Sequence, residues 1–264
     1  MSAVATLRAA AARVYHTVRS LGGQRYCPVC ERRVGRFTAL GDSYTREWKA
    51  HGFDHGVADF EMLNAADYGC PHCGASDRDR ICALYLRRRL ANVQSPLRLI
   101  DFAPSPALSS MLRHLPQIRY RSADLYMDGV DDRIDIVDMR AYADASVDCF
   151  ICLHVLEHVS DDAAAMRELA RILVPGGWGI LLVPVSTRLE RTRENPSAAT
   201  EAERWRWFGQ NDHVRLHTRR DFVMRAETAG LHVSKLGVDE FSRAEFGRCG
   251  ITESSILYVV ETHR

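Results

Sequence analysis

The chain has 264 residues, 46% of them hydrophobic and 26% charged, a composition typical of a globular protein large enough to bury its own core. No run approaches the ~18 apolar residues of a membrane-spanning helix. The formal net charge is +1. Residues 1–90 hold 14 Lys and Arg against 9 Asp and Glu, a basic surplus too weak to indicate nucleic-acid binding.

Residues 1–24 are predicted to form an N-terminal helix. Its apolar residues fall on one face, and residues 1–30 contain four arginines and no acid. This pattern leaves three alternatives open: an ordinary surface helix, a helix in weak contact with a membrane surface, or a transit peptide. No secretory signal is expected, because Arg8 and Arg13 interrupt the apolar residues.

Two cysteine pairs give the sharpest chemical signal, Cys27-Pro-Val-Cys30 and Cys70-Pro-His-Cys73. Two thiolates three positions apart can bend round one metal ion, and four complete a tetrahedral zinc site without an open position. We therefore predict a structural zinc ion bound by Cys27, Cys30, Cys70 and Cys73 in a module that spans residues 25–92. Cysteines grouped in this way suit a reducing compartment, so a cytoplasmic location is expected.

The 39 residues between the two pairs contain several aromatic side chains, which could supply core packing or a lid over a substrate. The sequence leaves both alternatives open. Ser76-Asp77-Arg78-Asp79 then begins a helix, because Ser76 can cap the free amides and Asp79 can close a capping box. This helix is expected to bridge the cysteine module and a main domain at residues 93–264.

In the main domain, short apolar runs alternate with helical segments. The predicted strands are Leu97–Phe102, Ile118–Asp124, Arg133–Val137, Val147–Leu153, Gly179–Val185, Leu231–Leu236 and Ile256–Glu261. The predicted helices include Pro106–Leu115, Asp161–Leu173 (ended by Pro175-Gly176-Gly177) and Arg219–Ala229. Such alternation predicts an α/β fold with a seven-stranded, mostly parallel sheet covered by helices on both faces.

Acidic residues stand where the predicted strands end, and ligands of parallel sheets bind beyond the carboxyl ends of the strands. The first strand ends in Asp101-Phe102-Ala103-Pro104-Ser105, where Ser105 is a plausible helix cap. Asp124 ends the second strand and could accept hydrogen bonds from both hydroxyls of a ribose. Asp135 and Ile136, on the third, could present an acid and an amide to an adenine edge.

The stretch from residue 144 to residue 185 contains Ser-Val-Asp, His-Val-Leu-Glu-His-Val and Leu-Val-Pro-Gly-Gly-Trp. With these motifs, residues 97–264 strongly resemble the class I S-adenosylmethionine-dependent methyltransferases, which have a Rossmann-like fold. The preceding double Cys-x-x-Cys module also resembles a group of bacterial methyltransferases of uncertain substrate. The resemblance implies S-adenosylmethionine as the cofactor.

The resemblance also implies the cofactor-binding residues. Carried over by position, Asp101, Ala103 and Ser105 contact the methionine part of the cofactor. Asp124 binds the ribose, with Leu125 in the same set, and Asp135 with Ile136 binds adenine. His154 lines the methyl-donating end.

One departure from the family concerns glycine. The family usually has glycines where this chain has Ala103, Ser105 and Ala107, and non-glycine residues resist positive φ. Two consequences are open: the turn follows a different path, or cofactor binding is weak or lost. The second would make the chain a non-catalytic binding protein.

Residues 186–218 are long for a connection, which suggests a functional loop. We hypothesise that His213 is the general base, that Asp212 orients it and that Arg215 binds an anionic group of the substrate. The expected acceptor is a small molecule or saccharide, methylated on oxygen. The alternative is an RNA acceptor held by the cysteine module, which ranks second because the basic front lacks interleaved aromatic residues.

Overall fold

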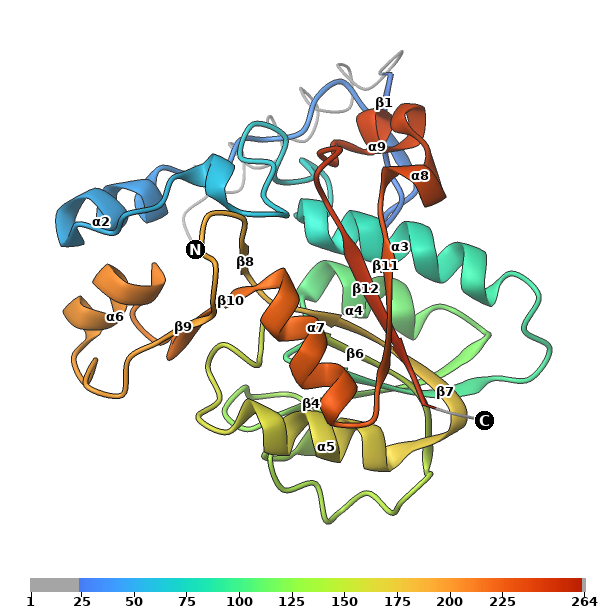
Figure 1. Cartoon of the computed structure of the whole chain (residues 1–264). Helices are drawn as coiled ribbons and strands as arrows, with labels where there is room; N and C mark the ends of the chain where they lie inside the picture. The colour runs from blue at the N-terminus through green and yellow to red at the C-terminus, as the bar shows by residue number, and fades with distance from the viewer. Residues whose placement is uncertain (1–23, 263–264) are drawn as a thin grey trace, which may run out of the picture.

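The computed structural model describes residues 24–262, and at its centre lies a seven-stranded sheet (Figure 1). Its strand order is β11-β12-β7-β6-β3-β4-β5. In chain order the strands are β3 (Leu97–Phe102), β4 (Ile118–Asp124), β5 (Asp132–Arg133), β6 (Val147–Leu153), β7 (Leu173–Leu182), β11 (His232–Leu236) and β12 (Leu257–Glu261). Among these seven strands β12 alone runs in the opposite direction, and the other pairings are parallel, so the predicted mostly parallel sheet is confirmed.

Helices cover both faces of this sheet, as predicted. The chain moves outward in opposite directions from the centre, β3 to β4 through α4 (Pro106–Arg113) and β6 to β7 through α5 (Asp162–Ile172). Because such crossovers are right-handed, the two helices lie on opposite faces. The bridging helix α3 (Asp77–Leu90) packs beside α4, and α7 (Arg219–Thr228) packs beside α5 (Figure 1).

Several predicted boundaries are wrong, and the fifth strand, predicted as Gly179–Val185, is Leu173–Leu182. The third strand is only Asp132–Arg133, so Asp135 and Ile136 lie in the loop beyond it. The helix predicted to stop at the Pro-Gly-Gly turn ends earlier, at Ile172, and β7 starts directly at Leu173. Gly176 does take a positive φ of 73°, but inside β7, where the pairing with β6 shifts register.

The cysteine module packs into the same core as the sheet. Its short hairpin, β1 (Arg25–Cys27) with β2 (Arg32–Val34), contacts α9 (Arg243–Cys249), which follows α8 (Val238–Phe241). The buried Arg80 joins these parts, because its guanidinium donates to Ala75 O (2.8 Å), Tyr68 O (2.9 Å) and Cys249 O (2.6 Å). The module is therefore continuous with the main domain.

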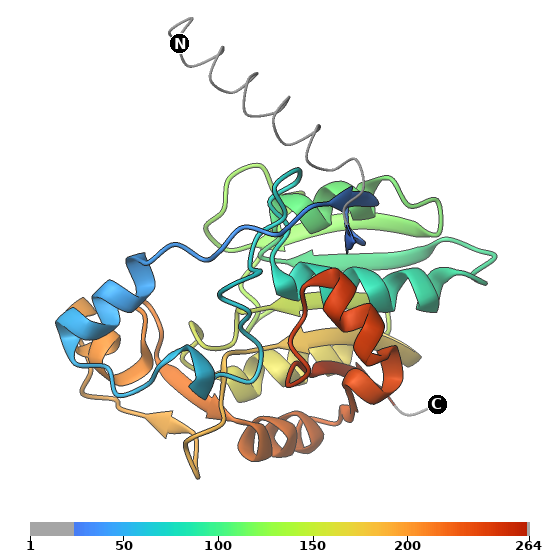
Figure 2. The same ribbon diagram turned by 90° about the horizontal axis from the view of Figure 1, so that it is seen from above.

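The residues between the cysteine pairs extend to the carboxyl ends of the strands of the sheet. Their helix α2 (Ser43–His51) packs on α6 (Glu201–Phe208), and both views show the two side by side (Figures 1 and 2). A 3₁₀ turn at Val57–Asp59 leads to Phe60, which bridges to β8 (Val185–Ser186). Strand β10 (Arg215–Thr218) links β8 with β9 (Arg193–Glu194). Trp48, Phe53, Phe208 and Leu216 fill the small core between these elements.

The predicted N-terminal helix at residues 1–24 lies outside the described residues, save for residue 24. Within residues 24–262, no helix combines the length and the apolar character needed to cross a bilayer.

Candidate active site

The turn between β3 and α4 has the backbone conformation for which glycine is the usual residue. Ala103 takes a φ of 50°, in the left-handed region, and its N–H donates to Ala123 O (2.9 Å). Ser105 Oγ accepts from Leu108 N (3.3 Å), which confirms the predicted helix cap. The same hydroxyl donates to Asp79 Oδ1 (2.9 Å), so the N-terminus of α3 supports the turn. The turn therefore forms without the glycines of the family pattern.

Asp101 lies beneath this turn rather than on its surface. Its side chain is buried, with 1% of the residue exposed, and Tyr120 OH donates to Oδ2 (2.8 Å). Burial raises the pKa of Asp101 to about 7, although the hydrogen bond from Tyr120 opposes this. The geometry suits a residue that holds the turn in place from below.

The other predicted cofactor residues stand at the same edge of the sheet. Asp124 Oδ1 accepts from Tyr126 N and Met127 N (2.7 Å each), which fixes the loop after β4. Leu125 is half-buried and begins this loop. Beyond β5, Asp135 is exposed and Ile136 is buried. Since β3, β4, β5 and β6 are parallel neighbours, their carboxyl ends bring this set together.

A cavity of about 290 Å³ lies beside this edge, at the carboxyl ends of β6 and β7. Residues from between the cysteine pairs cover it, and the end of α6 closes one side. The aromatic side chains that line it are Tyr44, Trp48, Phe60, Tyr68, Phe208 and Tyr258. This segment packs on α6 and forms a wall of the cavity.

Four titratable side chains form a cluster on the sheet side of the cavity: His154, Glu157, His158 and His213. His154 has a φ of 58°, and its Nδ1 lies 3.0 Å from Glu157 Oε1. The rings of His158 and His213 meet edge to face, with centroids 4.7 Å apart. The backbone of Val214 donates to Glu157 O (2.8 Å), which brings the predicted catalytic loop to the end of β6.

His213 is buried in this cluster, with 2% of the residue exposed. Burial lowers its pKa to about 4, while the neighbouring Glu157 acts in the opposite direction. The lowered pKa favours the neutral form of the ring at pH 7.

Asp212 and Arg215 do not have the positions predicted for them. Asp212 is exposed, and its Oδ2 lies 3.3 Å from His158 Nδ1, so it pairs with His158 instead of orienting His213. Arg215 is buried away from the cavity, and its guanidinium donates to Glu194 Oε1 (2.9 Å), Leu156 O (2.6 Å) and Ser160 O (2.8 Å). These contacts fix the turn that carries Glu157 and leave little of the guanidinium for an anionic substrate.

Sequence reasoning missed two charged residues of the cavity wall. Arg78, at the start of α3, lines the cavity with its guanidinium 3.5 Å from Tyr68 OH. Glu61 is buried, and its carboxylate accepts from Tyr258 OH (2.9 and 2.8 Å) and pairs with Arg219 (3.2 Å). In the sequence, the start of α3 indicates only a capping box, and Glu61 lies between the cysteine pairs. Only the tertiary contacts show that Arg78 and Glu61 line the cavity.

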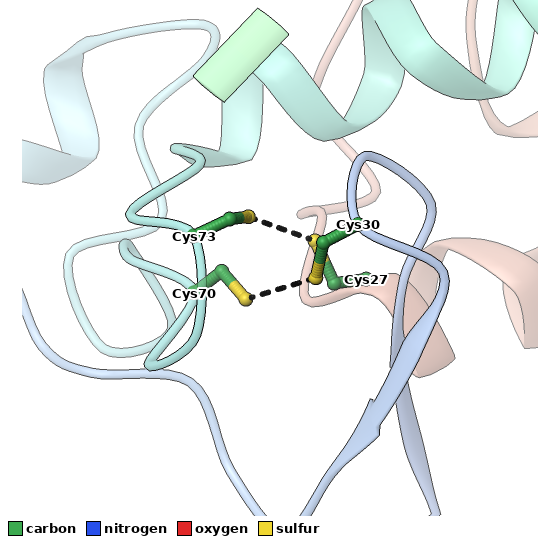
Figure 3. A group of neighbouring side chains, drawn as sticks. All are labelled: Cys27, Cys30, Cys70 and Cys73. Carbon is green, nitrogen blue, oxygen red and sulfur yellow. Dashed lines mark hydrogen bonds between the residues drawn. The ribbon is translucent and has the colours of Figure 1, made fainter. Parts of the chain in front are cut away.

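The four cysteines of the N-terminal module converge as predicted (Figure 3). Cys27 Sγ lies 3.8 Å from Cys73 Sγ, and Cys30 Sγ lies 3.8 Å from Cys70 Sγ. Four thiolates at ~2.3 Å from a tetrahedral zinc ion stand about 3.8 Å apart, so the spacing fits this metal. A residue with positive φ follows each pair, Glu31 (56°) and Gly74 (77°), which shows that both pairs end in the same kind of turn.

Several solved structures are similar to this chain over about 70% of its length. A chain from the complex between the Haloferax volcanii Trm112 methyltransferase activator and the putative methyltransferase is 18% identical, with a TM-score of 0.43 over 71% of this chain and 94% of that one. A putative methyltransferase from Bacillus halodurans is 13% identical, with a TM-score of 0.42 over 69% and 99%. A S-adenosylmethionine-dependent methyltransferase from Archaeoglobus fulgidus is 10% identical, with a TM-score of 0.45 over 71% and 95%.

The comparison with functionally curated proteins gives no match. A protein family described as "Methyltransferase domain" (Methyltransf_23) matches residues 75–236, from the last residues of the cysteine module to the end of β11. This range contains the turn after β3, the acids at the strand ends and the cluster at the cavity. The chain belongs to the methyltransferase domain family and is a class I S-adenosylmethionine-dependent methyltransferase with an N-terminal four-cysteine cluster.

Proposed function

We propose that this methyltransferase acts on a small-molecule or saccharide-type acceptor and methylates a hydroxyl oxygen. The cavity carries the proposal. Its volume of about 290 Å³ is close to the lower end of the usual range for small-ligand pockets. Aromatic side chains on its walls can cover the faces of a ring, and the cluster of His154, Glu157, His158 and His213 offers groups that can bind or deprotonate a hydroxyl.

The cofactor site consists of the residues named from the sequence, with one change of role. Ala103 and Ser105 present the turn to the methionine part, and Asp101 supports that turn from below. Asp124 and Leu125 take the ribose, and Asp135 with Ile136 takes adenine.

The role of binding an anionic group of the substrate, first given to Arg215, passes to Arg78, because Arg78 lines the cavity and Arg215 does not.

His213 is the proposed general base. S-adenosylmethionine supplies a methyl group bound to a positively charged sulfur, and an acceptor hydroxyl that takes this group must lose its proton. The neutral ring of His213 lines the cavity and can take that proton. Asp212 acts indirectly, because it pairs with His158, the neighbour of His213 in the cluster.

A further part of the proposal concerns the cysteine cluster. We assign it a zinc ion with a structural role, because four thiolates leave no open position for a substrate. The distances between the sulfur atoms support zinc.

The experiment uses S-adenosylmethionine with a labelled methyl group, offered together with a small-molecule extract and with total RNA. We expect label in the small-molecule fraction, and His213→Ala should reduce the transfer by about 10²- to 10⁴-fold with cofactor affinity unchanged. A matched control is His217→Leu, since His217 is buried but lies outside the cavity. Label in RNA alone would overturn the acceptor proposal, and unchanged turnover of His213→Ala would overturn the assignment of the base.

A further inference from the structure

Glu157 has an unusual environment for a carboxylate. It is fully buried, yet neither of its oxygens accepts a well-aligned hydrogen bond from residues 24–262. His154 Nδ1 lies 3.0 Å from Oε1 but lacks the alignment of a hydrogen bond. Buried carboxylates are normally paired, hydrogen-bonded or bound to a metal, because their charge is otherwise poorly compensated. Apart from this contact with His154, the carboxylate has no hydrogen-bond partner within residues 24–262, although its burial calls for one.

His213 lacks a partner in the same place. Its Nδ1 is buried and without a hydrogen bond within the described part of the chain. One oxygen of Glu157 and one ring nitrogen each of His158 and His213 lie within 4.8 Å of one another. Ligand atoms of one tetrahedral cation are about 3.4 Å apart, so shifts of about 1 Å would bring these three atoms to a common ion.

From this geometry we propose that Glu157, His158 and His213 bind one divalent cation of the first transition series. Two imidazoles and one carboxylate are a ligand set of catalytic zinc and iron sites, which keep open positions for water or a substrate. All three residues line the cavity, so an open position would face the acceptor.

The surrounding residues are arranged as they are around known metal sites. Asp212 Oδ2 lies 3.3 Å from His158 Nδ1, which leaves Nε2 of that ring available to the cation. A carboxylate paired with the second nitrogen of a ligating histidine fixes the ring and strengthens binding. Arg215 holds the carbonyls of Leu156 and Ser160, on either side of the turn that carries two of the ligands.

This inference rests on the proposed function only for the identity of the acceptor. The cation would bind the acceptor hydroxyl oxygen and orient it toward the methyl donor, and it would lower the pKa of the hydroxyl so that its proton passes to water. His213 would then serve as a ligand of the cation instead of the base, so the two roles are alternatives that metal binding can separate.

The test is a titration with Mn²⁺ of protein that carries one zinc ion per chain, in the four-cysteine cluster, and free Mn²⁺ is measured by electron paramagnetic resonance. Mn²⁺ prefers oxygen and imidazole ligands to thiolates, so it should not displace the ion of the four cysteines. We expect one Mn²⁺ per chain. His158→Gln, at an exposed position that tolerates the change, and Glu157→Gln should weaken binding by at least about 100-fold, and Asp212→Asn by about 10-fold.

His217→Leu is the matched control, since it removes a buried histidine outside the cluster and should leave Mn²⁺ affinity unchanged. The proposal is overturned if neither Mn²⁺ nor Co²⁺ binds at millimolar concentration, or if His158→Gln and Glu157→Gln bind as tightly as the parent. Since no acceptor or methyl donor is present, a wrong acceptor assignment would leave this result unaffected.

Discussion

Ser105 donates a hydrogen bond of 2.9 Å to Asp79, and this bond joins the turn after β3 to the helix that leaves the cysteine module. The other carboxylate oxygen of Asp79 accepts from Ser76 N (2.9 Å) and Ser76 Oγ (3.0 Å), which closes the capping box of α3. One buried carboxylate thus holds both the start of a helix and the cofactor turn. The cysteine module and the turn proposed to bind the cofactor are joined through this junction.

Asp79→Ala should therefore reduce both stability and cofactor affinity. Loss of a helix cap costs about 1 kcal/mol, and the two hydroxyls would also lose their acceptor. Urea unfolding measures the first effect, and calorimetric titration with S-adenosylhomocysteine measures the second.

The matched control is Glu203→Ala, because Glu203 closes an equivalent capping box with Thr200 at the start of α6, on the surface. That variant should lose some stability and keep its cofactor affinity. Equal cofactor affinity in both variants would show that the Ser105 hydrogen bond does not support the turn.

Ala103→Gly should stabilise the protein, against the usual effect of glycine. An alanine in the left-handed region is strained by about 1–2 kcal/mol, and glycine removes that strain. The greater conformational entropy of glycine in the unfolded chain opposes this gain by about 0.4–1 kcal/mol. The free energy of unfolding should therefore rise by about 1 kcal/mol. Ala107→Gly, in the ordinary helical backbone of α4, should instead destabilise by a similar amount. A loss of stability in both variants would contradict the strain at Ala103.

The sequence predicts the centre of the sheet better than its edge. Leu97–Phe102, Ile118–Asp124 and Val147–Leu153 have the bounds predicted, and Val147–Leu153 at the centre of the sheet is nearly continuous in apolar residues, as buried parallel strands are. The third strand was placed too far along the chain because Ile134 and Ile136 read as strand residues, whereas the edge of the sheet pairs only at Asp132–Arg133.

The positions of Ser105 and Asp124 at the carboxyl ends of strands were predictable, because the strand pattern alone places them there. The site was not predictable where a loop folds back. Asp212 is adjacent to His213 in the chain but pairs with His158, because the loop crosses the end of β6. Nothing in the spacing of the residues indicates that Arg78 would line a cavity covered by residues between the two cysteine pairs.

Asp101 should make the protein less stable as the pH rises. Its folded pKa of about 7 lies above the ordinary value near 4, so the folded state holds the proton more tightly. The stability from this group is complete below pH ~4 and is lost as the pH rises to ~7, by about 4 kcal/mol at most. Asp101→Asn should thus be more stable than the parent at pH 8 and show little advantage at pH 4, measured by urea unfolding.

Asp131→Asn serves as the control, because its effect on stability should change with pH in the opposite direction. Hydrogen bonds from the backbone and side chain of Ser122 hold the pKa of Asp131 below its usual range, so its stability is present at pH 8 and lost in acid. If Asp101→Asn were less stable than the parent at pH 8, burial of the ionised carboxylate of Asp101 would not destabilise the folded protein.

His217→Leu should protect the protein from acid. Neither ring nitrogen of His217 has a hydrogen-bond partner within residues 24–262, and burial lowers its pKa to about 4. The folded state resists protonation, so the stability from this group is present above pH ~6.5 and is lost as the pH falls to ~4, by about 3 kcal/mol at most. Leucine should shift the acid unfolding midpoint downward in circular dichroism. An unchanged midpoint would mean that the ring is protonated in the folded protein.

Removal of the metal from the cysteine cluster should unfold more than the module. Cys27 and Cys70 belong to the same buried core as Leu99 and Ile151, so the cluster and the sheet should melt together. A chelator, or Cys73→Ser, should lower the melting temperature of the whole chain in a single calorimetric transition, because structural zinc contributes directly to folding free energy. Cys152→Ala, at a buried thiol on β6, should leave the zinc content equal to that of the parent protein. Two separate transitions after chelation would instead show that the module folds apart from the sheet.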